Sequence, residues 1–364
     1  MSTRWLRDLG RLRDAALGTA GALVDRAAVD LALELGRSSR GQASRRSPEE
    51  HLRVLARVAE AYDPQGWGPG QEEGFFVTPG APAVREARVG SAPGGGSVVD
   101  LVCDSGYIPV HPVAHEDFVA AEANRTAYAR AWLHPQPRAA VLCVHGYLGG
   151  HMALEEAAFQ VGGLYARGLD VVVAVLPFHG PRTPPEGRGS FPGRDPWRTV
   201  EGFGQAVWDL RRWRAWLGAR GSSRVVLFGM SLGAYTSALA ATVDGDWDGL
   251  VAMVPLASLA DAYFDHRAGS PEAPPGWVRP RIEDAFRAVS PFTRPPRIRS
   301  DATLVLAAAG DRITPRAHAE RIAAHFDGAP LVEFPGGHLF QAGRARAFAR
   351  LGLYLESRGL VAPR

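Results

Sequence analysis

Ser231 is the serine in this sequence that is best placed to do chemistry. It lies at the centre of the stretch 229–233, of sequence Gly-Met-Ser-Leu-Gly, between an apolar run at 224–228 and an Ala-rich helical segment. This pattern predicts a tight turn from strand to helix, for which glycine two positions to either side leaves room. The backbone at Ser231 is then strained, its hydroxyl is exposed, and the N–H of Leu232 points at the same reaction centre. We predict that Ser231 is a nucleophile.

A serine hydroxyl is a poor nucleophile at neutral pH and needs a base that accepts its proton. His338 is the candidate base, because it lies in a glycine turn between a strand-like run and the C-terminal helical segment. Asp311 follows the apolar run 304–310 and is the candidate acid that would orient the imidazole. A turn aspartate that caps the next helix is the structural alternative, and Asp261 is the second choice for the acid. The order serine, aspartate, histidine favours the catalytic interpretation.

A second loop could stabilise the negative charge that develops on a substrate oxygen. The stretch 144–150, of sequence Val-His-Gly-Tyr-Leu-Gly-Gly, ends a buried strand-like run, and its glycines allow the backbone to approach a substrate. The N–H groups of Tyr147 and Leu232 are the predicted pair of oxyanion donors. We expect His145 to brace the loop by hydrogen bonds rather than to transfer protons.

Two further polar residues, His179 and Arg182, follow another strand-like run. They could contact a carboxylate or phosphate of the substrate, or they could belong to a Gly/Pro turn whose polar groups satisfy one another. The sequence leaves these alternatives open. The predicted chemistry needs neither a metal nor an organic cofactor.

The elements that position these residues are indicated by alternating strand-like and helical segments from Arg138 onward. Such alternation predicts a mostly parallel sheet with helices on both faces, and ligands of such sheets bind beyond the carboxyl ends of the strands. Two further strands are expected at 98–103 and near 127–133. The strand-like runs of the parallel part are 139–144, 170–176, 224–228, 250–254, 303–308 and 331–334.

From about residue 98 to the C-terminus, the chain resembles the α/β-hydrolase superfamily, on the esterase, lipase and peptidase side. Four segments carry the resemblance in the superfamily's order: 145–149, 229–233, 310–315 and 337–338. The resemblance implies the α/β-hydrolase fold, with Ser231, Asp311 and His338 as nucleophile, acid and base. The dehalogenases and epoxide hydrolases resemble the chain less, because they carry aspartate where it has Ser231. The resemblance does not specify the substrate, since the fold supports many reactions.

Two additions to this fold are expected. Residues 1–95 form an N-terminal helical extension and connector, and residues 96–364 form the catalytic domain. A lid-like insertion is predicted at 256–300, because that stretch is longer than a crossover needs and carries aromatic residues. Those aromatic residues could screen an apolar pocket from water or form the insertion's own small core.

The N-terminal extension is predicted to contain two helices, with a polar break at 38–47 between them and Ser47 as the cap of the second. The Pro/Gly-rich stretch 64–96 is expected to be an extended connector. We expect the helices to pack against the core or another subunit, and peripheral contact with a membrane surface is the alternative. The apolar positions at helical spacing in the first helix are Trp5, Leu9, Leu12, Ala16, Leu23, Ala27, Leu31 and Leu35.

Composition limits the class of protein. The 364 residues carry a formal net charge of only +3, with basic residues scattered among acidic ones, so no nucleic-acid partner is expected. Cys103 and Cys143 fall in or beside predicted strands and are expected to be reduced core thiols. No apolar stretch of signal length is present at the N-terminus, and the expected location is cytoplasmic.

Together these residues predict a serine hydrolase without a cofactor. It would cleave a carboxylic ester, or else a thioester or amide, of a small to medium hydrophobic acyl substrate through an acyl-enzyme. An acyltransferase, in which an alcohol or amine replaces water, could use the same triad. A non-catalytic binding module on the hydrolase scaffold is a further alternative, and the intact set of candidate residues argues against it.

Overall fold

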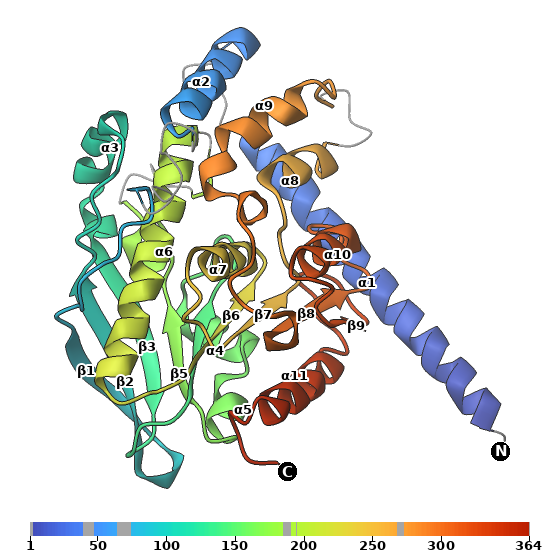
Figure 1. Cartoon of the computed structure of the whole chain (residues 1–364). Helices are drawn as coiled ribbons and strands as arrows, with labels where there is room; N and C mark the ends of the chain where they lie inside the picture. Colours follow the sequence, from blue (N-terminus) through green and yellow to red (C-terminus); the bar gives the residue numbers. More distant parts are fainter. Residues whose placement is uncertain are drawn as a thin grey trace.

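A nine-stranded sheet runs through the centre of the molecule (Figure 1). The computed structural model describes residues 3–38, 47–63, 74–184, 191–193, 195–267 and 273–363. The strands are β1 (Arg85–Ala92), β2 (Gly96–Asp104), β3 (Thr126–Leu133), β4 (Ala140–Val144), β5 (Asp170–Ala174), β6 (Val225–Met230), β7 (Gly249–Met253), β8 (Thr303–Ala308) and β9 (Leu331–Phe334). Their order in the sheet is β1-β2-β3-β5-β4-β6-β7-β8-β9.

Most of the sheet is parallel, as predicted. Strands β1, β2 and β3 pair antiparallel and β3 is antiparallel to β5, whereas all pairs from β5 to β9 are parallel. Strands β4 to β8 are buried along their whole length, so their apolar side chains need not alternate with polar ones. The eight strands predicted from the sequence are present, with ends that differ by at most two residues.

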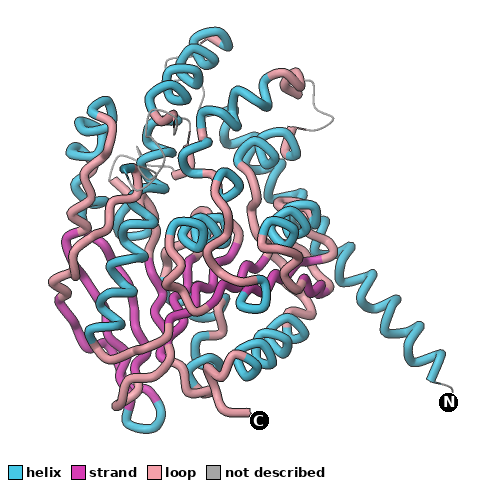
Figure 2. Tube along the Cα trace, in the orientation of Figure 1, coloured by secondary structure: helices cyan, strands magenta, loops and turns pink. Residues whose placement is uncertain are grey.

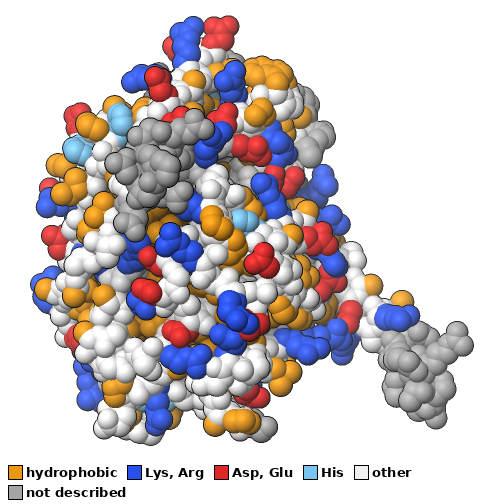
Figure 3. Space-filling model, in the orientation of Figure 1, with side chains coloured by type: hydrophobic (Ala, Val, Ile, Leu, Met, Phe, Trp, Pro, Cys, Tyr) orange, Lys and Arg blue, Asp and Glu red, His pale blue; other side chains and the backbone are white. Residues whose placement is uncertain are grey.

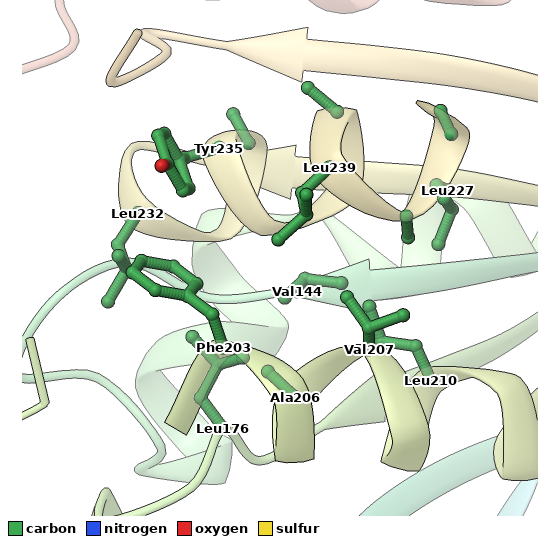
Figure 4. Close-up of a cluster of buried hydrophobic side chains, with 14 of the residues drawn as sticks. Val144, Leu176, Phe203, Ala206, Val207, Leu210, Leu227, Leu232, Tyr235 and Leu239 are labelled. Atoms are coloured by element: carbon green, nitrogen blue, oxygen red, sulfur yellow. The ribbon is translucent and has the colours of Figure 1, made fainter. Parts of the chain in front are cut away.

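Helices cover both faces of the sheet (Figure 2), and the buried apolar side chains accordingly form two clusters. One face carries α6 (Pro196–Ala219), α7 (Leu232–Val243) and α10 (Arg316–His325). The other carries α4 (Met152–Ala158), α5 (Val161–Tyr165) and α11 (Ala345–Ser357). Figure 4 shows side chains of α6 pointing toward those of α7, and the rings of Phe203 and Tyr235 lie 4.8 Å apart. This packing fixes α7, the helix that follows Ser231.

Strand β1 corrects the prediction of a connector over 64–96, of which residues 64–73 lie outside the described residues. Of the side chains in β1, only Ala92 is buried, so the sequence shows no alternation of apolar and polar residues. Backbone pairing with β2 makes the segment a strand, with an irregularity between Arg88 and Gly90. An exposed edge strand needs only one neighbour and no apolar face.

The N-terminal extension contains the two predicted helices, α1 (Thr3–Ser38) and α2 (Pro48–Ala61). Most of the predicted break between them, residues 39–46, lies outside the described residues. Ser47 caps α2 as predicted, because its Oγ accepts from Glu50 N at 3.1 Å and its N–H donates to Glu50 Oε2 at 2.7 Å. Helix α1 lies along the body at one end and extends away from it toward the N-terminus (Figure 1).

The face of α1 that packs on the body is not the predicted apolar one. Leu12 and Leu23 are 67% and 66% exposed, whereas Gly18, Gly21 and Asp25 are buried. The helix therefore approaches the body through two glycines and a carboxylate, which no apolar periodicity reveals. Contact of its exposed side with a membrane or another subunit stays a prediction.

The insertion between β7 and β8 contains α8 (Leu259–Asp265) and α9 (Val278–Ala285). Helix α9 packs against α2, and both contribute to one buried apolar cluster, through Leu55 and Val58 of α2 and Ile282 of α9. The insertion and helix α2 thus pack together, and we call them the cap. A further short helix, α3 (His115–Ala120), lies between β2 and β3.

The distribution of charge on the surface and the state of the cysteines are those expected from the sequence. On the face drawn in Figure 3, basic and acidic side chains are mixed rather than segregated. Cys103 and Cys143 are buried free thiols, as expected. Among the helices of the described residues, none combines the length and the apolar character needed to cross a bilayer.

Candidate active site

Ser231 occupies the turn from β6 to α7 that the sequence predicts. Its backbone angles, φ 54° and ψ −116°, are strained for a residue with a side chain. A Cβ atom added at Gly229 would overlap Gly233 O, and one added at Gly233 would overlap Val144 O. Glycine is therefore the residue that this close approach of strand and helix allows at both positions. Ser231 N donates to Met253 O at 3.0 Å, which ties the turn to the neighbouring strand.

Asp311 and His338 form a buried pair at the ends of β8 and β9. His338 Nδ1 lies 2.8 Å from Asp311 Oδ2, and the two side chains are 7% and 1% exposed. Because an ionised carboxylate only accepts, Nδ1 carries the hydrogen, which leaves Nε2 to receive a proton. Asp311 Oδ1 accepts from the N–H groups of Ile313 at 2.9 Å and Thr314 at 2.7 Å. Asp311 is thus a turn aspartate and the partner of the imidazole, but it does not cap the next helix, because α10 begins after Pro315 without a side-chain cap.

Thr314 is a third polar side chain at this pair, and the sequence interpretation missed it. Its Oγ1 lies 3.0 Å from Asp311 Oδ2, from His338 Nδ1 and from Val254 O. Thr314 follows Asp311 by three residues in the segment 310–315, and that spacing is the local signal that could have indicated it. The Thr314 hydroxyl thus joins Asp311 and His338 to the residue that follows β7.

The end of β7 also links this pair to Ser231. Leu256 N donates to Ser231 O at 3.2 Å, while Val254 O lies 3.0 Å from Thr314 Oγ1. Val254 has a positive φ of 42°, so the chain turns sharply between these contacts. Among the described residues no hydrogen bond joins Ser231 Oγ to His338, and such bonds often tighten only when substrate binds.

The loop that carries Tyr147 lies beside the serine. A Cβ atom added at Gly146 would lie 3.3 Å from Ser231 Cβ, so the backbone of this loop approaches Ser231. Tyr147 follows Gly146, and Leu232 is the first residue of α7, where helix N–H groups have no partner within the helix. The structure brings both predicted oxyanion donors to the turn at Ser231.

Two buried side chains hold this loop in place. His145 Nδ1 donates to Gly146 O at 2.7 Å, and its Nε2 accepts from Leu176 N at 3.0 Å, which confirms the predicted bracing role. Burial lowers the pKa of His145 to about 3, so the ring is neutral. Glu155 accepts from Gly150 N at 2.8 Å, and burial raises the pKa of Glu155. The sequence interpretation did not include Glu155, because only folding brings it to the loop.

His179 and Arg182 lie in different surroundings. The ring of His179 is 6.0 Å from that of Tyr147, its Nδ1 donates to Pro177 O at 2.8 Å, and burial lowers its pKa to about 4. Arg182 is wholly buried and pairs with Asp209 at 2.8 Å, and it also donates to Val175 O. These contacts account for Arg182 without a substrate, whereas His179 borders the loop of Tyr147.

Asp261, the second choice for the acid, lies in α8 rather than beside His338. It pairs with Arg279 and with Arg321, the latter at 2.6 Å. Asp261 therefore holds the insertion together and joins it to α10. Among the described residues no group of acidic, histidine or cysteine side chains is arranged to hold a metal ion.

The sheet order, the strained serine turn and the Asp311–His338 pair define the α/β-hydrolase fold. Solved structures with a similar fold include the acetyl xylan esterase of Paenibacillus sp. R4, with a TM-score of 0.53 and 17% identity over 85% of this chain and 95% of that one. Acetyl xylan esterase 1 of Thermoanaerobacterium sp. JW/SL YS485 gives a TM-score of 0.52 and 14% identity over 86% of this chain and 95% of that one. At this identity the likeness concerns the fold alone.

By sequence, the chain belongs to the family of two uncharacterized proteins of Mycobacterium tuberculosis. They are MT2702 of strain CDC 1551 and Rv2627c of strain H37Rv. Each is 32% identical over 336 residues, a match that spans 88% of this chain and 80% of the relative. No protein-family model matches the chain.

Proposed function

We propose that this protein is a serine hydrolase that cleaves a carboxylic ester of a small to medium hydrophobic acid. The observation that carries the proposal is the buried Asp311–His338 pair, which leaves Nε2 of the imidazole available beyond the same strand ends as the strained turn of Ser231. The likeness of the fold to solved esterases supports an ester rather than another class of substrate.

In the proposed reaction Ser231 Oγ attacks the ester carbonyl carbon while His338 Nε2 takes the hydroxyl proton. The carbonyl oxygen becomes negatively charged and is held by the N–H groups of Tyr147 and Leu232. The bond from carbonyl carbon to alcohol oxygen then breaks, and His338 returns the proton to the leaving alcohol. Water attacks the acyl-serine in the same way, which releases the acid and restores Ser231.

The choice of a hydrophobic acyl group follows from the position of the cap. The insertion begins directly after the segment that contacts Ser231, and Leu256 at its start is buried. A cap that begins at the nucleophile can keep water from an apolar group bound there. His179, which borders the loop of Tyr147, is proposed to line the site as a neutral ring.

The test is covalent labelling with a fluorophosphonate, followed by mapping of the modified residue by mass spectrometry. We expect modification at Ser231 that is absent in Ser231→Ala. A panel of p-nitrophenyl esters, from acetate through butyrate to octanoate, then gives the preferred acyl length. His338→Ala should lower kcat by about 10⁴-fold or more, because a triad without its base loses most of its rate enhancement. Absence of labelling in a folded protein would contradict the proposal.

A further inference from the structure

Asp25, in helix α1, contacts the backbone of both loops that carry the acid and the base. Its side chain is completely buried. Oδ2 accepts from His338 N at 2.6 Å and from Arg312 N at 3.1 Å, and Oδ1 accepts from Leu339 N at 2.9 Å. One carboxylate therefore joins the residue after Asp311 to His338 itself.

The helix backbone touches the same loops. A Cβ atom added at Gly21 would overlap Gly337 N, and one added at Gly310 would overlap Gly18 O. A Cβ atom at Gly337 would lie 2.7 Å from Asp25 Oδ2. These contacts leave no room for a side chain at Gly21, Gly310 or Gly337. Glycine at these positions therefore allows α1 to lie this close to the two loops.

The two loops also bond to each other, because Gly310 N donates to Gly336 O at 2.7 Å, but the N–H groups of His338 and Leu339 have the carboxylate of Asp25 as their acceptor. Gly336 and Gly337 precede His338, and Gly336 has a φ of 108°, which side chains rarely allow. Three backbone N–H groups directed at one carboxylate form charge-assisted hydrogen bonds, which are about twice as strong as neutral ones. Within the described residues no ion pair engages Asp25, so these N–H groups are its partners.

We infer that Asp25 is a positioning residue that holds the His338 loop and the Asp311 loop in register, which makes helix α1 part of the active site. The inference rests on the proposed function, since it concerns the same acid and base. Asp25 reaches them only through backbone N–H groups and touches neither the substrate nor the imidazole ring in any described contact.

The first test compares Asp25→Ala and Asp25→Asn with the wild type. We measure the rate constant of fluorophosphonate labelling from pH 5 to 9 and the labelled fraction at saturation, which counts folded active sites. Asp25→Ala should lower the rate constant by about 10- to 100-fold, because small misplacements of catalytic groups have effects of this size. Asp25→Asn should lose less, since its carbonyl oxygen can still accept from two of the three N–H groups. Leu12→Ala, on the same helix and 67% exposed, is the control and should label like the wild type.

A matched pair of glycine variants tests the same contact without changing charge. Gly21→Ala puts a methyl group against Gly337 N and should displace the helix, whereas Gly10→Ala, on the same helix, has no atom within 4 Å of the added Cβ. Gly21→Ala should therefore reproduce the slow labelling of Asp25→Ala, and Gly10→Ala should not. If Asp25→Ala fails to fold, the comparison of Gly21→Ala with Gly10→Ala tests the inference in its place.

A readout independent of catalysis separates this inference from the proposed function. The Nδ1 proton of His338 is hydrogen-bonded to a carboxylate and should give a downfield NMR signal that Asp311→Asn removes. We expect this signal to shift or vanish in Asp25→Ala and Gly21→Ala, and to persist in Leu12→Ala and Gly10→Ala. An unchanged signal together with unchanged labelling overturns the inference. Absence of labelling in the wild type, with the signal present and sensitive to Asp25, contradicts only the proposed function.

Discussion

His338 shares its Nδ1 with two oxygen atoms, those of Asp311 and Thr314. The threonine hydroxyl has one hydrogen, and three atoms within 3.0 Å compete for its interactions. If the hydroxyl donates to Val254 O, its lone pairs face His338 and help the imidazole to carry positive charge. If the hydroxyl donates to Asp311, it draws charge from the carboxylate and weakens the hydrogen bond that Asp311 accepts from His338. The rate of Thr314 variants reports which arrangement dominates.

For Thr314→Val we expect a lower kcat/KM, by about 10- to 150-fold, because loss of a hydrogen bond to a charged group costs about 1.5–3 kcal/mol. Thr314→Ser keeps the hydroxyl and should stay close to the wild type. The measurement is ester hydrolysis under conditions where both variants are folded by circular dichroism. Equal rates for the valine and serine variants would show that the hydroxyl has no part in the chemistry.

The neutral, buried side chain of His145 should make the stability of the protein depend on pH. The pKa of His145 is lowered to about 3 by burial, whereas an unfolded histidine has a pKa near 6.5. Between these values the unfolded state binds the extra proton, so the free energy of unfolding falls as the pH drops below 6.5. Because of His145 alone, the free energy of unfolding should be about 2 kcal/mol lower at pH 5 than at pH 7. Urea titrations at both pH values measure this difference in the free energy of unfolding. In His145→Gln the difference between the two pH values should be smaller by about 2 kcal/mol.

At the scale of residues, the sequence was sufficient to select Ser231, Asp311 and His338, because each stands next to an apolar run with a glycine turn. Their catalytic roles stay predictions until they are tested. Asp25 and Glu155 were missed for a physical reason: each acts on a loop by accepting from backbone N–H groups, and any loop offers such groups. A side chain that bonds to backbone N–H groups places no requirement on the residue types of the loop, so the sequence of the loop gives no sign of the contact.

At the scale of elements, the buried strands were predictable because continuous apolar runs are typical of a sheet covered on both faces. The edge strand β1 was not, because pairing with one neighbour imposes no pattern on its side chains. The packing of α2 on α9 was not predictable either, since each helix shows an apolar face without showing which other face covers it.

The end of α2 is held to α6 by a buried hydroxyl. Tyr62 donates to Glu201 Oε1 at 2.6 Å, and Glu201 also accepts from Tyr107 at 2.6 Å. Tyr62→Phe should lower the free energy of unfolding by about 1–3 kcal/mol, the cost of leaving a buried acceptor short of a partner. Tyr263→Phe is the control, since the Tyr263 hydroxyl makes no hydrogen bond among the described residues. Equal urea midpoints for the two variants would contradict this role of Tyr62.

At the scale of the whole molecule, the attachment of α1 differs from that of the other long helices. Helix α6 buries large apolar side chains along its length, whereas the described part of α1 buries two glycines and an aspartate. Its attachment thus depends on hydrogen bonds and close backbone contact rather than on apolar area. We expect α1 to separate from the body at a lower urea concentration than the sheet requires to unfold.

Labelling of Ser231 and far-UV circular dichroism, recorded over the same urea series, check this expectation. Labelling should slow before most of the ellipticity is lost, and the early loss should be recovered on dilution. A single transition seen by both probes would mean that the helix and the sheet unfold as one unit.

The N–H groups of Arg312, His338 and Leu339 need an acceptor in any protein that shares this arrangement of loops. A descendant of the same ancestor that lost the N-terminal helix would have to supply a bound water or a new polar side chain at that spot. Helix α1 and the glycines that admit it should therefore be gained and lost together during evolution, as a single heritable unit whose two parts lie far apart in the sequence.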